Sequence, residues 1–497
     1  MRAHEAGAMH GEGDQRGHRG PSWLSPPEDV NALVPALWAR SVRRCDAGSL
    51  TVGGLDVRDL AAEFGTPAYV IDEDDFRARA REFKAAFDGV FQDLCAGADV
   101  YYAGKAFLCT AVARWIDEEG LGLDVCSGGE LAVAIRAGFP GARIGFHGNN
   151  KSVPEIETAL RYGVGRIVVD SFAEIERVAD AAQRLGVTAP VMVRVTVGVE
   201  AHTHEYIATA HEDQKFGFSL AGGEAAEAVR RILNHAAHVS LLGLHSHIGS
   251  QIFDTSGFEV ATRRVLGLHL DVAREHGIQL PELDLGGGFG IAYTTQHDPS
   301  SPRELAGGMA QILERECRAE GVPCPRISVE PGRAIAGPST FTLYEVGTVK
   351  EVLLDGGASR TYIAVDGGMS DNIRPALYDA DFSCTIAGRV SQAPATLSRV
   401  VGKHCESGDI LVNDEFLPSD VRPGDLLAVP VTGAYCRSLS SQYNHVPRPP
   451  VVAVSGDAAG DAAGNVAGNA AGGAAGSTAR QIVRRETIED LLALDLD

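Results

Sequence analysis

Hydrophobic and polar positions follow two different periods along this chain, and the change of period divides it. Between residues 76 and 340, short β-rich apolar runs alternate with longer stretches of helical spacing. Helical segments such as 171–186 and 256–277 end in a glycine, which suits a helix C-cap. The apolar runs predict eight strands, at residues 99–104, 122–126, 143–148, 166–170, 191–197, 241–247, 282–288 and 326–332. Eight strands alternating with helices predict an α/β fold with a closed (β/α)8 barrel, and the count favours closure over a doubly wound sheet.

Beyond residue 340 the pattern becomes that of strands separated by turn residues, with strand-like runs at residues 340–354, 360–368, 382–390, 395–405, 424–436 and 450–455. Residues 341–497 therefore predict a C-terminal all-β domain, a β-sandwich or β-barrel. A strand-like run over 66–76 precedes the barrel, so we expect residues 46–75 to contribute to the β domain, which would be discontinuous in sequence. The barrel itself would occupy residues 76–340.

Two segments carry no periodic pattern. Residues 1–45 are rich in Gly, His, Pro and charge, which predicts a flexible N-terminal extension. Residues 456–479 consist almost wholly of Gly, Ala, Asn and Asp and are too polar and small to bury a core. Because strand-like residues lie on both sides, we interpret them as a loop inserted into a β-hairpin.

Composition narrows the function classes. The chain has 497 residues, with 44 Lys and Arg against 66 Asp and Glu, and a formal net charge of −22. This acidic balance excludes a nucleic-acid role that depends on a basic surface. No run approaches the ~20 apolar residues of a membrane span, and the first residues lack the apolar core of a secretory signal. The nine cysteines show no paired spacing. We therefore expect a cytoplasmic protein that binds neither nucleic acid nor membrane.

Polar residues and glycines follow the predicted barrel strands, at the rim where barrel enzymes carry their catalytic groups. These strand-end residues are Lys105, Asp124, Cys126, Glu130, His147, Asn149, Arg194, His245, His247, Ser250, Gly286, Gly287, Gly288, Glu330 and Arg333. Their gathering at one rim predicts a functional site.

Four of these features together predict a cofactor. Lys105 is one of only six lysines, and a strand-end lysine can bind an aldehyde as a Schiff base. Three consecutive glycines let backbone N–H groups approach a phosphate. Taken singly, an exposed lysine, a turn or an ion pair explains each feature. With a histidine to brace a ring and a carboxylate for its nitrogen, their joint occurrence predicts pyridoxal 5′-phosphate (PLP).

The histidines support a rival hypothesis. His245-x-His247 and His202-x-His204 are spaced like metal ligands, which would indicate a metal-dependent barrel hydrolase. Such a hydrolase is expected to place this pair on its first strand, whereas here it lies on the sixth. A metal site also leaves Lys105 and the glycine loop unexplained, so this hypothesis ranks second and we expect no metal.

Longer motifs carry a specific resemblance. In order, they are YAGKAF, GLDVCSGGEL, HGNNKS, GLHSHIGSQ, DLGGGFGI, EPGRAI, DGGMSDNIRPALY, GKHCESGDI and TGAYC, between about residue 48 and 455, and the match resumes at 480. With these motifs the chain resembles the diaminopimelate decarboxylases, PLP enzymes of the barrel type that includes alanine racemase and eukaryotic ornithine decarboxylase. The runs VGVEAHTHEYIATAHEDQKFG and HCESGDI are similar to the actinobacterial members in particular. The two aperiodic segments lie outside every motif.

The resemblance implies cofactor-binding roles. Lys105 would bind the cofactor aldehyde, His247 would stack on the ring and Glu330 would bond the ring nitrogen. The remaining cofactor-binding residues would be Ser250, Gly286, Gly287 and Gly288 at the phosphate, together with Gly332, Arg333 and, from the β domain, Tyr435.

The resemblance also implies a substrate site. Arg333, Arg374 and Tyr378 would bind the distal carboxylate of the substrate, with Tyr435 nearby. Cys405, a candidate proton donor, and Glu406, which would meet the distal amine, would come from the partner subunit of a homodimer with shared active sites. Two arginines suit a substrate that keeps a second carboxylate, because Arg binds carboxylates bidentately.

The expected reaction is decarboxylation of meso-2,6-diaminopimelate to L-lysine and CO2, the last step of lysine biosynthesis. Three alternatives stay open from the sequence: a related decarboxylase or racemase of the same fold, a non-catalytic PLP-binding protein, and the metal hydrolase. Glu330 disfavours the racemase, because racemases of this type generally place Arg at the ring nitrogen.

Overall fold

The computed structural model describes residues 20–95, 97–198, 215–353, 359–456 and 476–496. The chain divides into two compact units. The barrel unit comprises Arg77–Ile291 and Asp298–Ile335, and the β unit comprises the residues up to Phe76, Ala292–His297 and the residues from Ala336 onward. In the described part of the chain, each helix is too short or too polar to cross a membrane.

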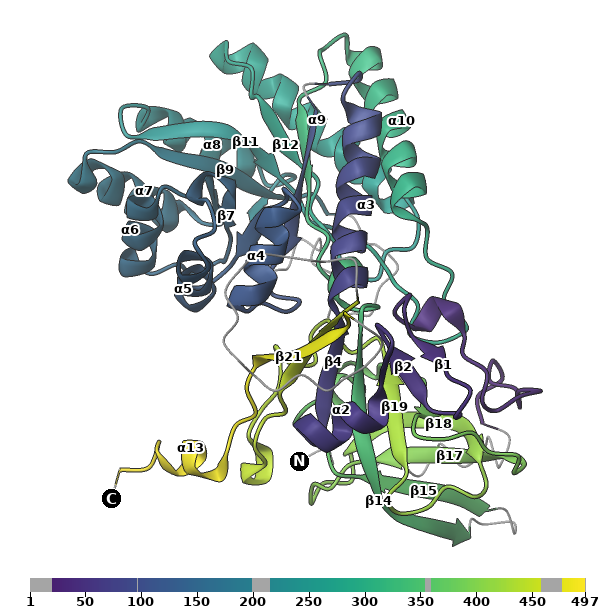
Figure 1. Cartoon of the computed structure of the whole chain (residues 1–497). Helices are drawn as coiled ribbons and strands as arrows, with labels where there is room; N and C mark the ends of the chain where they lie inside the picture. The colour runs from purple at the N-terminus through teal and green to yellow at the C-terminus, as the bar shows by residue number, and fades with distance from the viewer. Residues whose placement is uncertain (1–19, 96, 199–214, 354–358, 457–475, 497) are drawn as a thin grey trace, which may run out of the picture. The chain divides into compact units, whose positions relative to one another are not determined.

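Eight parallel strands form the barrel, in the order β9-β11-β12-β13-β5-β6-β7-β8, and β8 pairs again with β9 to close it (Figure 1). The strands are β5 (Ala98–Ala103), β6 (Gly122–Val125), β7 (Ile144–Phe146), β8 (Arg166–Val169), β9 (Ala189–Thr196), β11 (Val239–His245), β12 (Glu282–Asp284) and β13 (Arg326–Val329). A two-residue strand, β10 (Phe218–Ser219), adds to β9. All eight strands expected from the sequence are present, so the closed barrel is confirmed.

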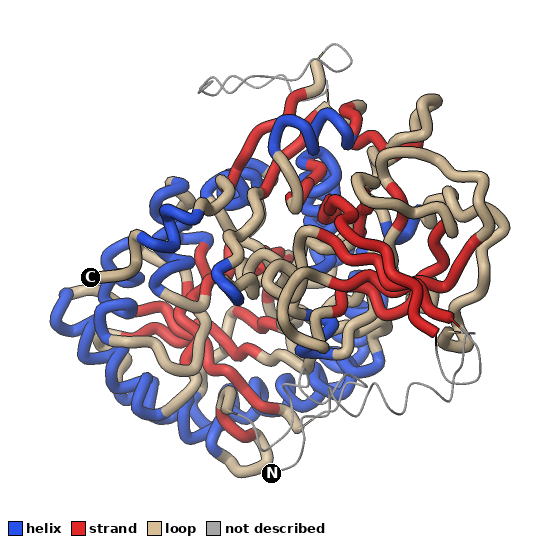
Figure 2. Tube along the Cα trace, turned by 90° about the horizontal axis from the view of Figure 1, so that it is seen from below, coloured by secondary structure: helices blue, strands red, loops and turns tan. Residues whose placement is uncertain are grey.

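Helices lie outside the barrel strands, as Figure 2 shows. They are α3 (Glu73–Phe91), α4 (Thr110–Glu118), α5 (Gly128–Ala137), α6 (Val153–Tyr162), α7 (Phe172–Leu185), α8 (Glu224–Asn234), α9 (Ser256–His276), α10 (Pro302–Glu320) and the short α11 (Arg333–Ala336). Gly186 and Gly277 end α7 and α9 with φ of 66° and 67°. These are the left-handed C-caps that the sequence predicted, and glycine takes this conformation without steric cost.

The barrel interior contains a buried arginine. Arg166 on β8 is only 3% exposed, and its guanidinium donates hydrogen bonds to Ser328 Oγ at 2.8 Å and to Tyr101 Oη at 2.7 Å. It also pairs with Asp284 Oδ2 at 3.2 Å. Asp284 in turn accepts the Gly286 N–H at 2.8 Å. Through Asp284, the buried charge of Arg166 is therefore linked to the glycine loop that follows β12, residues 286–288.

The β unit is built on one long sheet in the order β18-β17-β15-β14-β4-β20-β21, with β19 also pairing with β14 and β16 pairing with β19. Its elements, in which η marks a 3-10 helix, are η2 (Pro35–Leu37), β1 (Arg43–Arg44), β2 (Leu50–Val52), β3 (Leu55–Asp56), α2 (Val57–Phe64), β4 (Ala68–Asp72), β14 (Thr340–Leu353), β15 (Ser359–Val365), α12 (Arg374–Tyr378), β16 (Thr385–Ile386), β17 (Ala395–Val401), β18 (Ile410–Pro418), β19 (Leu426–Pro430), η4 (Tyr443–His445), β20 (Val451–Ser455), β21 (Thr478–Val483) and α13 (Ile488–Leu492). Strand β4 pairs with β14 and β20, so a segment that precedes the barrel completes a sheet formed after it.

The N-terminal expectation needs a correction. Residues 20–45 are not a loose extension, because Leu37 and Trp38 are 2% and 6% exposed and the Trp38 ring lies 5.9 Å from that of Phe341. The Arg44 guanidinium donates to the carbonyls of Ile386 and Arg389 at 3.2 and 3.1 Å. Apolar residues spaced among prolines thus dock on the β unit with little regular structure, namely the 3-10 helix η2 and the two-residue strand β1. Residues 1–19 lie outside the described residues.

Two details of the β unit also differ from expectation. The sequence did not predict β18, whose mixed apolar and acidic residues pair with β17, and the run 382–390 forms only the two-residue strand β16. Strands β20 and β21 are antiparallel, as expected for a hairpin. The Ala/Gly-rich insertion between them lies outside the described residues over 457–475.

Candidate active site

A cavity of about 300 Å³ opens at the carboxyl ends of the barrel strands. Lys105, which follows β5, Glu330, which follows β13, and His247, which follows β11, all line it. Its other lining residues are Ala103, Gly104, Asp124, Val125, Cys126, Glu130, His147, Gly148, Asn149, Arg194, Lys215, Phe216 and His245. The predicted aldehyde-binding lysine, ring-stacking histidine and ring-pairing carboxylate therefore share one pocket.

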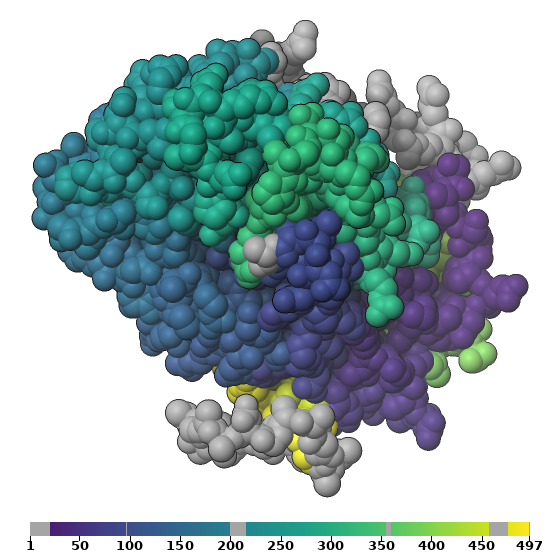
Figure 3. Space-filling model, turned by 90° about the horizontal axis from the view of Figure 1, so that it is seen from above, coloured from purple at the N-terminus to yellow at the C-terminus, as the bar shows by residue number. Residues whose placement is uncertain are grey.

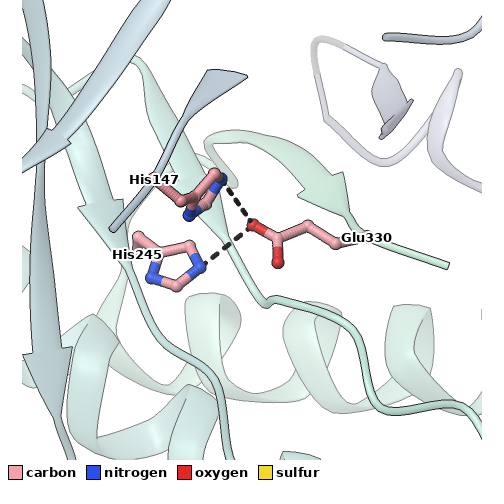
Figure 4. Close-up of side chains that lie close together, drawn as sticks. All are labelled: His147, His245 and Glu330. Atoms are coloured by element: carbon pink, nitrogen blue, oxygen red, sulfur yellow. Dashed lines mark hydrogen bonds and ion pairs between the residues drawn. The ribbon is translucent and has the colours of Figure 1, made fainter. Parts of the chain in front are cut away.

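Glu330 is the electrostatic centre of this pocket. The Nε2 atoms of His245 and His147 lie 3.0 and 3.3 Å from the same carboxylate oxygen, Oε1, and Figure 4 shows both imidazoles pointing at it. The same atom, His147 Nε2, also lies 3.2 Å from Asp124 Oδ1, within ion-pair distance of both carboxylates. Glu330 is 8% exposed, so these groups interact with little competition from water.

Burial and the neighbouring charges shift the pKa values of the two acidic groups in opposite directions. Burial by itself raises the pKa of Glu330, but the charges of His147 and His245 and the hydrogen bond from His245 outweigh it and hold that pKa well below its usual value. Asp124 shows the opposite balance, because burial and the neighbouring Glu330 charge raise its pKa to about 7. The pocket thus keeps one carboxylate ionised next to a second that binds a proton readily.

His247 is held as a neutral ring. Burial, Lys105 and Arg194 place its pKa well below the usual value. Its Nδ1 accepts the Gly287 N–H at 3.2 Å, so the ring proton of the neutral form lies on Nε2. A neutral imidazole can lie against an aromatic ring without the cost of burying a charge.

The glycine loop needs its glycines for close approach to the neighbouring strand ends. A Cβ on Gly287 would lie 2.2 Å from the Glu330 carbonyl oxygen, and one on Gly288 would lie 2.2 Å from that of Gly249. Gly286 and Gly288 have φ of 71° and 102°, which other residues rarely adopt. The loop therefore holds its backbone directly against the ends of β11 and β13.

The predicted phosphate and cofactor contacts lie beside this loop. Arg333 Nη2 donates to Ser250 Oγ at 2.8 Å, and Arg333 is 7% exposed. Gly332 lets the end of β13 approach the end of β5, because a Cβ there would lie 2.8 Å from the Ala103 carbonyl oxygen. The barrel unit thus brings together the sequence-predicted residues from Lys105 to Arg333.

The remaining predicted residues, Arg374, Tyr378, Cys405, Glu406 and Tyr435, lie in the β unit. Arg374 is only 5% exposed, and its guanidinium carbon lies 4.5 Å from the centre of the Tyr293 ring and 5.6 Å from that of Phe382. Its Nε and Nη1 have no hydrogen-bond partner among the described residues. A buried guanidinium stacked on rings and lacking an anion is costly unless a ligand supplies one.

Cys405 and Glu406 are exposed, but hydrogen bonds hold the loop that carries them. Asp409 accepts the N–H groups of Met369 and His404 at 2.6 and 2.7 Å, and His404 Nε2 lies 2.8 Å from Ser370 Oγ. The loop therefore presents the side chains of Cys405 and Glu406 at the surface of the β unit. Tyr435, the last of the five predicted residues in the β unit, has a φ of 65°. This is a strained backbone conformation of the kind often found at functional sites.

Sequence reasoning placed Asp124, His147 and His245 at strand ends but gave them no part in the cofactor site. The available signal was their position at the ends of neighbouring strands. The rival metal hypothesis paired His245 with His247, whereas these two rings diverge: His245 meets Glu330 and His247 meets the glycine loop. His202 and His204 lie outside the described residues.

The chain is similar to known proteins over the barrel and beyond it. Residues 73–337 match the family model "Pyridoxal-dependent decarboxylase, pyridoxal binding domain". The chain is 53% identical to a diaminopimelate decarboxylase of Mycobacterium leprae over the full length of both chains. It is 55% identical to that of Mycobacterium tuberculosis, covering 93% of this chain and 98% of the relative.

A relative from Bacillus subtilis with the same name is 44% identical over 91% of this chain and 97% of its own. Among solved structures, a diaminopimelate decarboxylase from M. jannaschii in complex with L-lysine superposes with a TM-score of 0.82 at 30% identity, over 92% of this chain and 98% of that one. The pocket with its lysine, neutral histidine and ionised carboxylate thus lies in a chain that is similar to diaminopimelate decarboxylases along its whole length. The chain belongs to the diaminopimelate decarboxylase family of pyridoxal-dependent decarboxylases.

Proposed function

We propose that this protein is a PLP-dependent enzyme that decarboxylates meso-2,6-diaminopimelate, giving L-lysine and CO2. The observation that carries the proposal is the single pocket shared by Lys105, His247 and an ionised Glu330. Family membership gives the reaction class, and the chemistry of the side chains must account for the cofactor and the substrate.

The donor set fits PLP. Glu330, kept ionised by His147 and His245, offers an acceptor for a protonated ring nitrogen. Neutral His247 suits one face of the ring, and Lys105 lines the same cavity for the aldehyde. When bound, PLP acts as an electron sink that stabilises negative charge at the substrate's α-carbon. Glu330 strengthens this effect because a protonated pyridine ring withdraws more electron density than a neutral one.

The phosphate would be held by Ser250 and the backbone of Gly286, Gly287 and Gly288, with Gly332 and Arg333 as further contacts. The support is the close packing of this loop and the hydrogen bond from Arg333 to Ser250. Backbone N–H groups and a guanidinium are the donors that phosphate prefers.

The distal carboxylate of the substrate would bind Arg374, with Arg333, Tyr378 and Tyr435 as further contacts. Two unpartnered nitrogens on a buried guanidinium call for an anion, and diaminopimelate retains a carboxylate after the other is lost. Ornithine or lysine as substrates would lack this second carboxylate. The arginine therefore favours diaminopimelate over the diamine-producing substrates.

The test of the reaction is CO2 release by the purified protein with added PLP, comparing meso-diaminopimelate, L-lysine, L-ornithine and L-arginine. We expect release from meso-diaminopimelate only, with L-lysine as product. Lys105→Ala should lose both the absorbance of bound cofactor and turnover, whereas Lys350→Ala, on the exposed end of β14, should keep both. Full activity in Lys105→Ala, or release from ornithine instead, would contradict the proposal.

Cys405 and Glu406 are proposed to act across a homodimer, Cys405 as a proton donor to the α-carbon and Glu406 at the distal amine. Their exposure on a well-anchored loop supports a role towards a second subunit. Random exchange of subunits between Lys105→Ala and Cys405→Ala protein makes half of the dimers mixed, and each mixed dimer has one intact site and one that carries both substitutions. The mixture should therefore recover up to about a quarter of wild-type activity. No recovery after verified subunit exchange would exclude shared sites. The cytoplasmic location and the absence of nucleic-acid partners also stay predictions.

A further inference from the structure

The run HGNNKS, which follows β7, contains a lysine that the proposed reaction does not use. The side chain of Lys151 is 1% exposed, and Lys151 is not among the residues that line the cofactor cavity. Its Nζ donates to the carbonyls of Gly148 and Val168, each at 2.6 Å, and to Glu174 Oε1 at 2.8 Å. All three N–H groups of the ammonium therefore have an acceptor.

The three acceptors belong to different elements of the barrel unit. Gly148 lies in the loop after β7, Val168 lies on β8, and Glu174 lies in the first turn of α7. Helices α6 and α7 lie on the outside of the barrel, and their surface is the blue to teal area on the left of Figure 3. The buried ammonium therefore ties the loop after β7 to the neighbouring strand and to the helix that follows that strand.

The counter-ion of Lys151 is itself held in place. Glu174 is 0% exposed, and its second oxygen, Oε2, accepts the Asp170 N–H at 2.8 Å. The Asp170 carboxylate in turn accepts the Gly217 N–H. Burial lowers the pKa of Lys151 and raises that of Glu174, although the charge of each acts against the shift in the other. The pair therefore has a fixed place between β8 and α7.

The ammonium does something that an apolar side chain cannot do. A buried ion pair is costly to desolvate, and an apolar pair of similar volume is often no less stable. Only a donor, however, can bond to the carbonyls of Gly148 and Val168. On its other side the loop lies against the end of β6, since a Cβ on Gly148 would lie 2.9 Å from the Cys126 carbonyl oxygen. The loop is thus held between β6 and the ammonium of Lys151.

The side chain that this loop presents to the pocket is His147, the neighbour of Gly148. Its N–H donates to the Val125 carbonyl at 2.8 Å, and its Nε2 lies 3.3 Å from Glu330 Oε1. Burial raises the pKa of Glu330, and the charge of His147 is the largest effect that lowers it again. A shift of the loop would therefore move this imidazole away from the carboxylate at the centre of the pocket (Figure 4).

We propose that Lys151 is a positioning residue for the cofactor: with Glu174 as its counter-ion, it fixes the loop after β7 so that His147 meets Glu330. This inference rests on the proposed function, because it takes Glu330 as the partner of the PLP ring nitrogen. Without the ammonium, the Gly148 carbonyl loses its donor and the loop is free to move away from β8. His147 then holds Glu330 less firmly, and the pocket retains PLP less tightly.

The test removes the ammonium from the holoenzyme without leaving an unpaired buried charge. In Lys151→Met/Glu174→Gln, the new amide oxygen can still accept the Asp170 N–H, whereas the lysine's bonds to the two carbonyls are lost. PLP should leave this variant about tenfold faster in cofactor-free buffer, followed by the absorbance of the bound cofactor. With excess PLP, kcat should fall about tenfold while KM for meso-diaminopimelate stays within about threefold of wild type.

Two controls separate positioning from a loss of stability. Lys84→Met/Asp88→Asn makes equivalent changes at a partly exposed ion pair on α3 and should retain PLP as wild type does. Val178→Ala truncates a fully buried side chain on α7. It should lower Tm without faster loss of PLP from the folded protein, because it leaves every bond of the ammonium in place. PLP loss in Val178→Ala as fast as in Lys151→Met/Glu174→Gln would overturn the inference.

A double-mutant cycle tests the route through His147. His147→Asn alone should speed the loss of PLP, and adding Lys151→Met/Glu174→Gln should then change the rate by less than about twofold, because the positioned imidazole is already gone. An undiminished further effect, or wild-type PLP retention in Lys151→Met/Glu174→Gln, would overturn the inference.

Lys151→Arg keeps the charge and supplies a second variant should the first fail to fold. A planar guanidinium cannot direct three N–H groups of one nitrogen at these acceptors, so PLP should leave about threefold faster than from wild type. Wild-type retention in Lys151→Arg would count against the inference. A wild-type chain that binds no PLP would instead contradict the proposed function, and this inference with it.

Discussion

A buried arginine in the barrel unit, Arg166, and one in the β unit, Arg374, have opposite surroundings. Arg166 in the barrel is 3% exposed and Arg374 in the β unit is 5% exposed. The first donates to Ser328 and Tyr101 and pairs with Asp284. The second stacks on two aromatic rings and keeps two nitrogens without a partner among the described residues.

This difference separates a structural charge from a functional one. In the barrel, burial by itself lowers the pKa of Arg166, but Tyr101, Asp284 and Glu282 outweigh it, so the native state favours the charged form. Among the described residues of the β unit, no hydrogen-bond acceptor meets Nε or Nη1 of Arg374. A protein bears that cost when a ligand provides the missing anion. Burial alone would have assigned both residues to the core, and only their partners distinguish them.

The largest expected effect is on the structural charge. Arg166→Met should lower the free energy of unfolding by about 3–5 kcal/mol, because it leaves Asp284 buried without its cation. Urea denaturation followed by circular dichroism measures it. Adding Asp284→Asn should recover part of the loss, and Arg274→Met, at a 67% exposed side chain, is the matched control. A loss below ~1 kcal/mol would show that the barrel network is not a stabilising unit.

Arg374→Met should act on substrate rather than on stability. We expect kcat/KM for meso-diaminopimelate to fall about 100-fold, since a bidentate contact to the distal carboxylate is lost, while Arg374→Lys should retain part of it. The free energy of unfolding should stay within about 1 kcal/mol of wild type or rise, because an uncompensated buried charge is removed. If Arg374→Met were as destabilised as Arg166→Met, with normal kinetics, the distinction between the two arginines would be wrong.

A smaller effect concerns pH and the pocket. The pKa of Asp124 is raised to about 7 and that of His147 is raised, so the folded state binds more protons than the unfolded state between about pH 4 and 7. Stability from both groups is therefore present at low pH and lost as pH rises through these values. Between pH 5 and 8 the contribution of these two groups to the free energy of unfolding should fall by roughly 1–2 kcal/mol. His247, whose pKa is lowered, contributes in the opposite direction, so the difference between wild type and an Asp124 variant carries the test.

Asp124→Asn should remove the contribution of Asp124 to this pH dependence, so that stability falls less, or rises more, with pH than in wild type. Asp271→Asn, at a solvent-exposed carboxylate, should leave the profile unchanged. Thermal denaturation at several pH values provides the measurement. A pH profile of stability in Asp124→Asn that matches the wild-type profile would assign the titration to other groups.

Local signals were sufficient for much of this fold. All eight barrel strands could be predicted, because each is a short apolar run and because glycines such as Gly186 and Gly277 end the helices between them. Strand β18 escaped prediction because its acidic residues, among them Asp414 and Glu415, hide the apolar alternation. The N-terminal segment escaped because Trp38 and Leu37 dock without a periodic pattern.

The sequence by itself determined the residue types at the strand ends, since parallel strands in a barrel bring all their carboxyl ends to one rim. It therefore indicated the positions of Lys105, His247 and Glu330. Only the tertiary structure decided which groups face one another: strand register and closure direct His147 and His245 to one oxygen of Glu330, and Arg166 to Asp284. These partners are far apart along the chain, and their meeting depends on which side of each strand points inward, which composition and spacing do not specify.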